Sequence, residues 1–500
     1  MSRIARVRVC QVSRADVVVT PRYPYATIIR MYGPLERLRA TGKRIVSSIE
    51  KRTEWYERAF AVDEIRTNIR LQLYMGASLL MFFLIFFSWG FGSTITIEDA
   101  AFGESICWPY AQGCDALFFF HELNIDYSQS LFYMMLYGVL VIIAWSMFRG
   151  RWRLAHALLF LPLIWESLVT LVLSYSISAP YYYYHIILTA ALLLATHKEF
   201  FIKALFVLLY FLSATIKFDA GWILGTYFTS LKTGLPLFPD TLTPLFTNLV
   251  IGMQVVGSWF LLSTKRILQR SAFVFFTAFH LYSGVLVLFY YVTVALPPLL
   301  IFFGPPYRHT PIPFSKKTIT GWVLIGLLVL FHLTGFLISS GDRRLSGEGN
   351  RYGMFMFDAN HQCVMQARVH LTTPTTEEIS LRTTQPGTQC RRMYCLISST
   401  LSPFRSTSVR TDRFESGAAL YRCDPYEWWT RYKQLCEHDS RVWNVEFTMD
   451  HSINGGPFYR IVDTTDVCSL EYKPFSHNEW IKLPPEAPVV GRPVLNTYRN

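Results

Sequence analysis

An ammonium and a carboxylate stand two positions apart where an apolar run of the chain ends. The segment SATIKFDAGWILG, residues 213–225, places Lys217, Asp219 and Trp222 directly after the run FIKALFVLLYFL. A lysine buried away from water can lose its proton near neutral pH and then act as a base. At a membrane surface it would instead extend its ammonium into the headgroups, and Trp222 would be an interfacial anchor. Asp219 orients Lys217, caps the next segment or faces water.

Two other ionisable residues interrupt apolar runs. His280 lies about ten residues into the run that begins at residue 271, and Glu166 stands in LPLIWESLVTL. Ionisable groups inside a membrane are costly, so they usually have a partner or a task. His280 is therefore a candidate catalytic residue, with a core histidine bonded to a neighbouring helix as the alternative. Glu166 is a candidate supporting residue, either protonated or paired with His156, His280 or Lys203.

The composition of the whole chain indicates a multi-pass membrane protein. Of 500 residues, 51% are hydrophobic and 16% are charged, and the mean hydropathy is +0.26. The net charge of +12 is concentrated near the start, where residues 1–69 hold 14 Lys and Arg against 7 Asp and Glu. A basic segment before a first span favours a cytoplasmic anchor over nucleic-acid binding. The first residues lack the apolar core of a cleavable signal peptide.

Apolar runs long enough for membrane helices recur along the chain. A helix needs about 20 apolar residues to cross a bilayer. Residues 271–303 are too long for one span and predict a hairpin broken at Pro297 and Pro298, with a short second segment. With that hairpin the count is eight to nine segments. The other predicted spans are 71–92, 130–148, 154–174, 181–196, 200–217, 243–263 and 321–338.

Charge patterning predicts the orientation of these segments. The connections RGRWR, HKEFFIK, KRILQR and YRHTPIPFSKK are basic and would join the N-terminus on the cytoplasmic side. The loop at residues 94–127 carries acidic residues and would lie outside. An odd number of spans places residues 340–500 in the periplasm, in the extracellular space or in a lumen.

The cysteines agree with this topology. Eight of nine fall in the two predicted outer regions, where the oxidising environment favours disulfides. Cys107 and Cys114 could close a local loop, or one of them could tie that loop to the C-terminal region. Free buried thiols are the alternative, and a metal site is not expected because no CxxC pair occurs. The disulfide candidates are Cys107, Cys114, Cys363, Cys390, Cys395, Cys423, Cys436 and Cys468.

The C-terminal part changes character. QARVHLTT, WNVEFTMD and FYRIVDTTDVCSLEY alternate like half-buried strands. We therefore predict a multi-pass α-helical membrane bundle with a C-terminal, mostly β, disulfide-stapled extracytoplasmic domain. The expected parts are a basic cytoplasmic segment (1–69), a transmembrane domain (70–340), the β-rich domain (341–480) and a Pro-rich tail (481–500).

The run KFDAGWILG resembles the K-[LF]-D-A-[DG]-W-x-x-G signature of vitamin K-dependent gamma-glutamyl carboxylases and of their bacterial relatives, the horizontally transferred transmembrane (HTTM) proteins. FTAFHLYSGVLVLFYYVTVALPPLL and GEGNRYGMFMFDANHQC resemble a later helix and the start of the outer domain of that family. Together they cover roughly residues 60–365. The resemblance implies that Lys217 is the base that deprotonates reduced vitamin K or another membrane quinol, with His280 at the same site.

One departure concerns the second half of the family reaction. Carboxylases carry an Asn-His pair before a Tyr-rich helix start, and here Tyr182 and Tyr183 occupy that place. His185 could substitute only from a shifted position, and His332 is given no role. The departure puts carboxylation of glutamate in doubt.

Two functions of different classes remain. The chain is either a quinol-dependent enzyme, with a peptide or protein substrate on the outer face, or a non-enzymatic membrane protein whose outer domain binds a partner. A transporter is less favoured, because no repeat halves are visible.

Overall fold

The computed structural model divides into two compact units, Met1–Ala59 and Phe60–Asn500. In the first unit residues 54–59 are helical, and the rest of the predicted cytoplasmic segment lies outside the described residues. Everything below concerns the second unit. The structure describes residues 54–91, 105–114, 128–230, 234–286, 291–307, 310–339, 341–375, 407–417 and 423–491.

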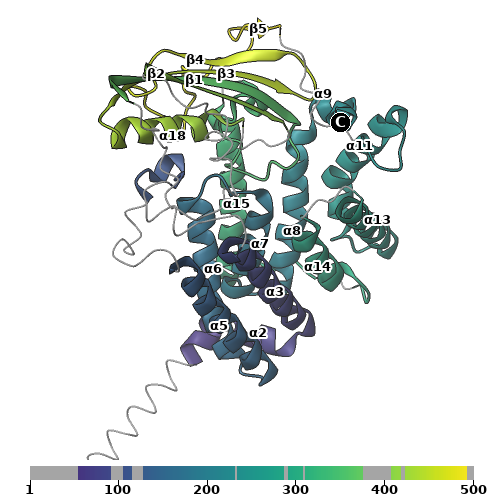
Figure 1. Ribbon diagram of the computed structural model, residues 1–500. Coiled ribbons are helices and arrows are strands. Elements are labelled where there is room, and N and C mark those ends of the chain that lie inside the picture. Colours follow the sequence, from purple (N-terminus) through teal and green to yellow (C-terminus); the bar gives the residue numbers. More distant parts are fainter. Residues whose placement is uncertain are drawn as a thin grey trace, which may run out of the picture. The chain divides into compact units, whose positions relative to one another are not determined.

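Each apolar run that predicts a membrane segment forms a helix (Figure 1). The predicted run at 154–174 ends in the π-helical turn Val169–Leu173, and the run at 243–263 contains the π-helical turn Met253–Gly257 in its middle. The longer helices are α3 (Ile69–Phe91), α5 (Ser128–Phe148), α6 (Trp152–Leu168), α7 (Pro180–Leu194), α8 (Lys198–Ala214), α11 (Thr243–Gly252), α13 (Arg266–Val285), α14 (Val292–Phe303) and α15 (Ile319–Ile338). Short helices are α2 (Val62–Thr67), α9 (Ala220–Ile223), α10 (Thr226–Thr229), α12 (Ser258–Phe260) and α16 (Arg343–Ser346).

Five helical segments among the described residues are long and apolar enough to cross a membrane. Their apolar side chains are exposed on the outer faces of the helices, as those of Phe83, Val141 and Leu330 are. Contiguous apolar surface of this kind fits contact with lipid. The remaining predicted spans are also helical, but they fall short of this length or of this hydropathy. The five segments are Ile69–Gly90, Gln129–Phe148, Trp152–Leu173, Lys198–Lys217 and Lys316–Ile338.

The predicted hairpin at 271–303 forms, but its break is not at the prolines. The turn precedes Val292, so Pro297 and Pro298 lie inside α14. The two helices meet closely at Gly284, where a Cβ would lie 2.7 Å from Cγ1 of Val292. A proline inside a membrane helix is tolerated where neighbouring helices pack around it. The contact between α13 and α14 therefore determines where the hairpin turns, and the two prolines do not.

The C-terminal region contains an antiparallel sheet in the order β2-β1-β3-β4-β5. From Met365 onward, alternate side chains of β1 are buried, as the period of a strand requires: Met365, Ala367, Val369 and Leu371. Two of the predicted strand segments lie within β1 and β3, and the third is a strand only in its first half. The strands are β1 (His361–Thr375), β2 (Thr407–Gly417), β3 (Val442–Ile453), β4 (Phe458–Thr464) and β5 (Val489–Val490).

A helix that the sequence analysis did not predict covers this sheet. α18 (Pro425–His438) begins with Asp424, whose carboxylate accepts from the main-chain N–H of Tyr426, and with proline at its first position. The ring of Tyr432 lies 5.4 Å from that of Phe447 on β3. Figure 1 shows α18 on the face of the sheet that is turned toward the helices. The domain is therefore a sheet with a helical layer, and not β structure alone.

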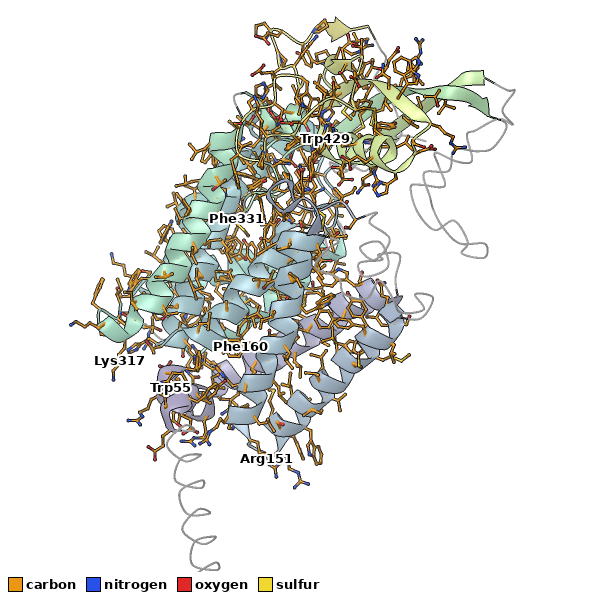
Figure 2. All side chains as sticks on the ribbon, turned by 90° about the vertical axis from the view of Figure 1, so that its left-hand side faces the viewer. Trp55, Arg151, Phe160, Lys317, Phe331 and Trp429 are labelled. Carbon is orange, nitrogen blue, oxygen red and sulfur yellow. A yellow bond between two sulfur atoms is a disulfide. The ribbon has the colours of Figure 1, made fainter. Side chains whose placement is uncertain are left out.

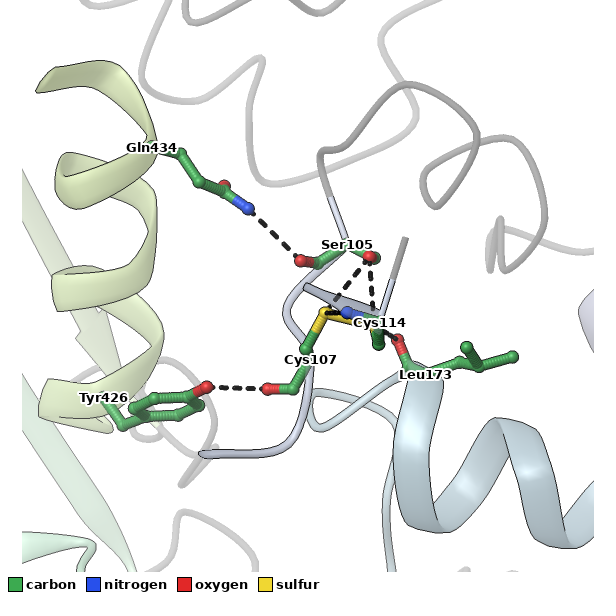
Figure 3. The surroundings of a disulfide bond; sticks show 6 residues. All are labelled: Ser105, Cys107, Cys114, Leu173, Tyr426 and Gln434. Carbon is green, nitrogen blue, oxygen red and sulfur yellow. Dashed lines mark hydrogen bonds between the residues drawn. A yellow bond between two sulfur atoms is a disulfide. The ribbon is translucent and has the colours of Figure 1, made fainter. Parts of the chain in front are cut away.

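Among the described residues, three disulfides are formed at the end of the molecule that holds the sheet. Cys363–Cys423 links β1 to the start of α18, and Cys436–Cys468 links its end to the segment after β4. Cys107–Cys114 closes the local loop. Figure 3 shows that this loop is tied to α18, because Tyr426 donates to the carbonyl of Cys107 and Gln434 to that of Ser105. Cys390 and Cys395 lie outside the described residues.

Two cations labelled in Figure 2 lie at one end of the helices. Figure 2 places Arg151 and Lys317 at the end remote from the sheet, whereas Trp429 of α18 lies at the other end. Both cations belong to the connections that the sequence analysis assigns to the cytoplasm.

Candidate functional site

Lys217 lies at the end of α8, where the helix tightens into a 3₁₀ turn, Thr215–Lys217. Its side chain is buried, with 2% of the residue exposed. The Nζ atom donates to the carbonyl of Ser213 at 2.6 Å and lies 5.2 Å from the ring centroid of Trp222. The amine therefore does not extend into solvent as an anchor would.

Asp219 is committed to other partners. It caps α9 by accepting from the N–H of Gly221 at 2.6 Å, and it forms an ion pair with Arg344 at 2.5 Å. Burial raises the pKa of Asp219, and the guanidinium of Arg344 opposes that rise. Burial disfavours the charge of Arg344, but Asp342 and Asp219 together raise its pKa. Of the three roles considered for Asp219, the structure shows the cap.

Gly221 in the same motif is required by a close approach. A Cβ at this position would overlap the amide of Asn454, in the turn between β3 and β4, and would lie 2.8 Å from Asp219 Oδ1. The side chain of Asn454 also accepts from the N–H of Asn360 at 2.9 Å. The motif after Lys217 therefore docks against the outer sheet.

Asp358, just before β1, is a second carboxylate near Lys217, close enough for its charge to act on the amine. It accepts from Asn350 at 3.0 Å and lies 3.3 Å from Nε2 of His361. Nδ1 of His361 in turn lies 3.1 Å from Nε2 of His451. These side chains form a buried chain of hydrogen bonds.

The hydrogens along this chain follow from its far end. The carbonyl of Leu345 only accepts, so Nδ1 of His451, 2.6 Å away, donates to it. Burial lowers the pKa of His451 to about 3, so its ring is neutral and Nε2 accepts from Nδ1 of His361. Nε2 of His361 lies 3.3 Å from the carboxylate of Asp358 and completes the chain. Burial alone would raise the pKa of Asp358, but the contact with His361 brings it below its ordinary value.

Both carboxylates near Lys217 thus have other partners: Asp219 forms an ion pair with Arg344, and Asp358 is hydrogen-bonded to His361. Among the described residues, none forms an ion pair with Lys217 itself. An ion partner would stabilise the ammonium, whereas burial favours the neutral amine. The arrangement therefore suits a lysine that works as a base.

An apolar cavity of about 300 Å³ lies beside the amine. Trp222 forms part of its wall and donates to the carbonyl of Phe357 at 2.6 Å. Phe357 has a positive φ of 56°, which is costly for a bulky residue, and this hydrogen bond helps to hold it. The wall is formed by Lys217, Trp222, Phe228, Leu235, Phe238, Phe246, Thr247, Leu249, Val250, Gln254, Phe275, Ala278, Phe279, Tyr282, Ser283, Tyr291, Met356 and Phe357.

His280 is not part of this wall. It is fully buried, and its Nε2 is hydrogen-bonded to the hydroxyl of Tyr210. Nδ1 has no partner among the described residues. Its neighbours Phe279 and Ser283 do line the cavity. The structure therefore places His280 one layer behind the wall that carries Lys217, as a core histidine bonded to a neighbouring helix.

Glu166 has a partner that the sequence analysis did not propose. Its carboxylate lies 2.8 Å from Nδ1 of His185, whose Nε2 lies 2.9 Å from the hydroxyl of Ser78. The proposed partners His156 and Lys203 are engaged elsewhere, with the carbonyl of Leu193 and with Glu199. Glu166 and His185 form a buried pair between α6 and α7.

Tyr182 and Tyr183 are also held by neighbouring elements. The indole of Trp89 donates to the hydroxyl of Tyr182 at 2.9 Å, and the hydroxyl of Tyr183 donates to the carbonyl of Arg351 at 2.9 Å. Both rings are buried. These contacts join α7 to α3 and to the segment before β1.

His332 on α15 positions the turn that carries Lys217. Thr215 gives its hydrogen to the carbonyl of Leu212, so it accepts from Nε2 of His332 at 3.0 Å. Nδ1 of His332 accepts from the N–H of Met354 at 3.1 Å. No local pattern in the sequence marks this role, nor those of Arg344, Asp358 and His361, because each depends on a residue distant in the chain.

No protein-family model, curated protein or solved structure matches this chain.

Proposed function

We propose that this membrane protein binds a membrane quinol in the cavity and that Lys217 accepts the proton of a quinol hydroxyl. The observation that carries the proposal is a buried amine at the wall of an apolar cavity, with both nearby carboxylates engaged by other side chains. The resemblance of KFDAGWILG to the carboxylase signature adds to it.

The residues fit such a ligand. Aromatic rings of the wall can stack on a flat ring system, and the apolar side chains can take a hydrocarbon tail. A bound quinol supplies two electrons and two protons. With molecular oxygen as the acceptor, the balanced products are the quinone and hydrogen peroxide. The part of the protein is to exclude water and to hold a neutral amine at the hydroxyl that loses its proton.

The proposed setting includes the finer topology. Eight to nine segments cross the membrane, the N-terminus lies in the cytoplasm, and the sheet lies on the opposite, oxidising side. Disulfides at Cys107–Cys114, Cys363–Cys423 and Cys436–Cys468 support that side for the sheet. Lys217 would then lie toward the outer leaflet, beneath a domain that can present a peptide or protein substrate.

Replacement of Lys217 tests the base. We expect Lys217→Met to abolish quinol oxidation, followed by quinone absorbance in purified membranes, while the protein remains folded. The matched control is Lys198→Met at the other end of α8. Lys198 is equally buried and donates to the carbonyls of Leu193 and Ala195, but it lies roughly 28 Å away by helical rise. Unchanged turnover in Lys217→Met removes the base from the proposal.

Mass spectrometry of lipids that co-purify with the protein tests the ligand. We expect a quinone in wild type. Its absence, together with absence of oxidation when reduced quinone is added, contradicts a quinol site.

A second candidate is a membrane protein without catalysis, whose outer domain binds a partner. The engagement of Tyr182 and Tyr183 in contacts between elements favours it, since these residues replace the family's Asn-His pair. Incubation of a Glu-rich peptide with reduced quinone and bicarbonate separates the possibilities. A mass gain of the peptide indicates carboxylation, oxidation alone indicates the quinol reaction, and neither favours the binding protein.

A further inference from the structure

Most polar side chains in the wall of the cavity beside Lys217 already use their hydrogens within the protein. The hydroxyls of Thr247, Tyr282 and Ser283 donate to main-chain carbonyls. The indole N–H of Trp222 does the same. The hydroxyl of Tyr291 contacts another tyrosine hydroxyl at 3.4 Å. Few donors therefore remain for a ligand.

Besides Lys217, Gln254 is the polar side chain of the wall that is not engaged in this way. It lines the cavity and is 2% exposed, and its Oε1 has no hydrogen-bond partner among the described residues. It lies on the π-helical turn Met253–Gly257. Turns of this kind interrupt a helix and are frequent at functional sites. A buried amide without partners is costly, so its presence in an apolar wall requires a reason.

Lys217 has donor capacity left as well. Its ammonium or amine uses one hydrogen on Ser213, and the others are free to meet a ligand. The cavity thus offers two polar groups, on different elements, in a wall of rings and aliphatic side chains. A ligand that satisfies both carries two separate oxygen functions on a flat apolar body.

We infer that Gln254 is the second polar contact of the ligand, hydrogen-bonded to the oxygen of a para-quinone or para-quinol that is opposite to the oxygen at Lys217. The inference rests on the proposed function and adds a positioning residue to it. Gln254 fixes which hydroxyl faces the amine. Either atom of the amide end can serve, as a donor to a quinone carbonyl or as an acceptor from a quinol hydroxyl.

The test is equilibrium binding of a tritiated naphthoquinone with a short isoprenoid tail to purified protein in nanodiscs, with empty nanodiscs subtracted. We expect Gln254→Leu to bind the naphthoquinone about fivefold to tenfold more weakly. The naphthalene with the same tail and no oxygens should bind equally to both proteins. Without ligand, Gln254→Leu should unfold at a temperature higher by roughly 2 °C, because it removes a buried amide without partners.

Gln269→Leu is the matched control. Gln269 is also buried and lies outside the cavity wall, and its amide donates to the carbonyl of Leu261 at 3.3 Å. Its replacement should leave quinone affinity unchanged and should lower the unfolding temperature. The opposite signs of the two thermal shifts separate a ligand contact from general damage to the fold.

The outcomes also separate this inference from the proposed function. If wild type binds the naphthoquinone and Gln254→Leu binds it equally well, or if both compounds lose affinity alike, Gln254 is not a polar contact and the quinol site still stands. If wild type binds no naphthoquinone, both proposals fail.

Discussion

At the scale of single residues, the site depends on which side chains engage the carboxylates around Lys217. Two side chains do so: Arg344 forms an ion pair with Asp219, and His361 is hydrogen-bonded to Asp358. Sequence alone leaves Asp219 as a group that could hold Lys217 charged. The structure assigns that carboxylate to a guanidinium and to a helix cap, which leaves the amine without an ion partner among the described residues.

A double variant tests this arrangement. In His361→Gln, Asp358 loses its hydrogen bond to the imidazole, and its charge then favours the ammonium form of Lys217. We expect quinol oxidation to fall roughly tenfold or more. The additional change Asp358→Asn removes the unpaired charge and should recover most of the rate. Failure of the double variant to recover, in protein that is still folded, contradicts an electrostatic role for the pair.

A second prediction at this scale concerns pH and stability. Glu427 is fully buried, 3.7 Å from Arg351 and 3.9 Å from Arg431. Burial raises the pKa of Glu427 from 4.5 to about 7 and that of Asp424 from 3.8 to about 6. At a pH between its unfolded and its folded pKa, each of these carboxyls binds more protons in the folded protein than in the unfolded protein. The free energy of unfolding therefore falls as pH rises through that range.

Thermal unfolding should show this pH dependence of stability. We expect the unfolding temperature to decrease from about pH 5 to about pH 8, with Glu427 accounting for about 3 kcal/mol. Glu427→Gln should flatten most of this dependence. Curves of equal slope for wild type and variant would show that Glu427 is not the titrating group.

At the scale of elements, α15 connects the bundle to the sheet. His332 links the turn of Lys217 to the segment before β1. At Gly335, three positions before the end of the helix, the backbone of α15 meets that segment directly. At Gly335 a Cβ would lie 2.5 Å from a ring carbon of Phe355 and 2.7 Å from the carbonyl oxygen of Gly349. The second neighbour is backbone and has little freedom to move.

Two glycines of the same helix give a matched pair. Gly335→Ala should lower the unfolding temperature strongly, at a cost of about 1–3 kcal/mol for the overlap. Gly326→Ala, where nothing lies within 4 Å of the added carbon, should be neutral or slightly stabilising, because alanine is the better helix former. Equal effects of the two changes would show that α15 does not pack against the outer segment as described.

At the scale of the whole molecule, charge and disulfides indicate the same orientation. Arg151 and Lys317 lie at the end remote from the sheet, and the three described disulfides lie at the end near it. In sealed vesicles with the cytoplasmic face outward, we expect protease to remove an N-terminal tag and to spare the domain from residue 341 onward until detergent is added. Cleavage of that domain in intact vesicles would reverse the proposed topology.

The sequence by itself determined the properties that depend on residues close together in the chain. Hydropathy located the longer helices of the bundle, since burial in lipid depends on each residue's own side chain, and the parity of the cysteines agrees with the described disulfides. Alternation located β1 and β3. The helix α18 also carries local signals, Asp424 as its cap and Pro425 at its first position, and could have been predicted from them.

Only the tertiary structure decided the chemistry around Lys217. Arg344 and Asp219 are 125 positions apart, and Trp222 meets a carbonyl 135 positions away. The cavity, the pairing of Glu166 with His185, the placement of His280 behind the wall and the amide of Gln254 all depend on such distant neighbours. A local pattern shows which residues are unusual. Whether each is satisfied, paired or left open to a ligand is set by what packing brings within a few ångströms of it.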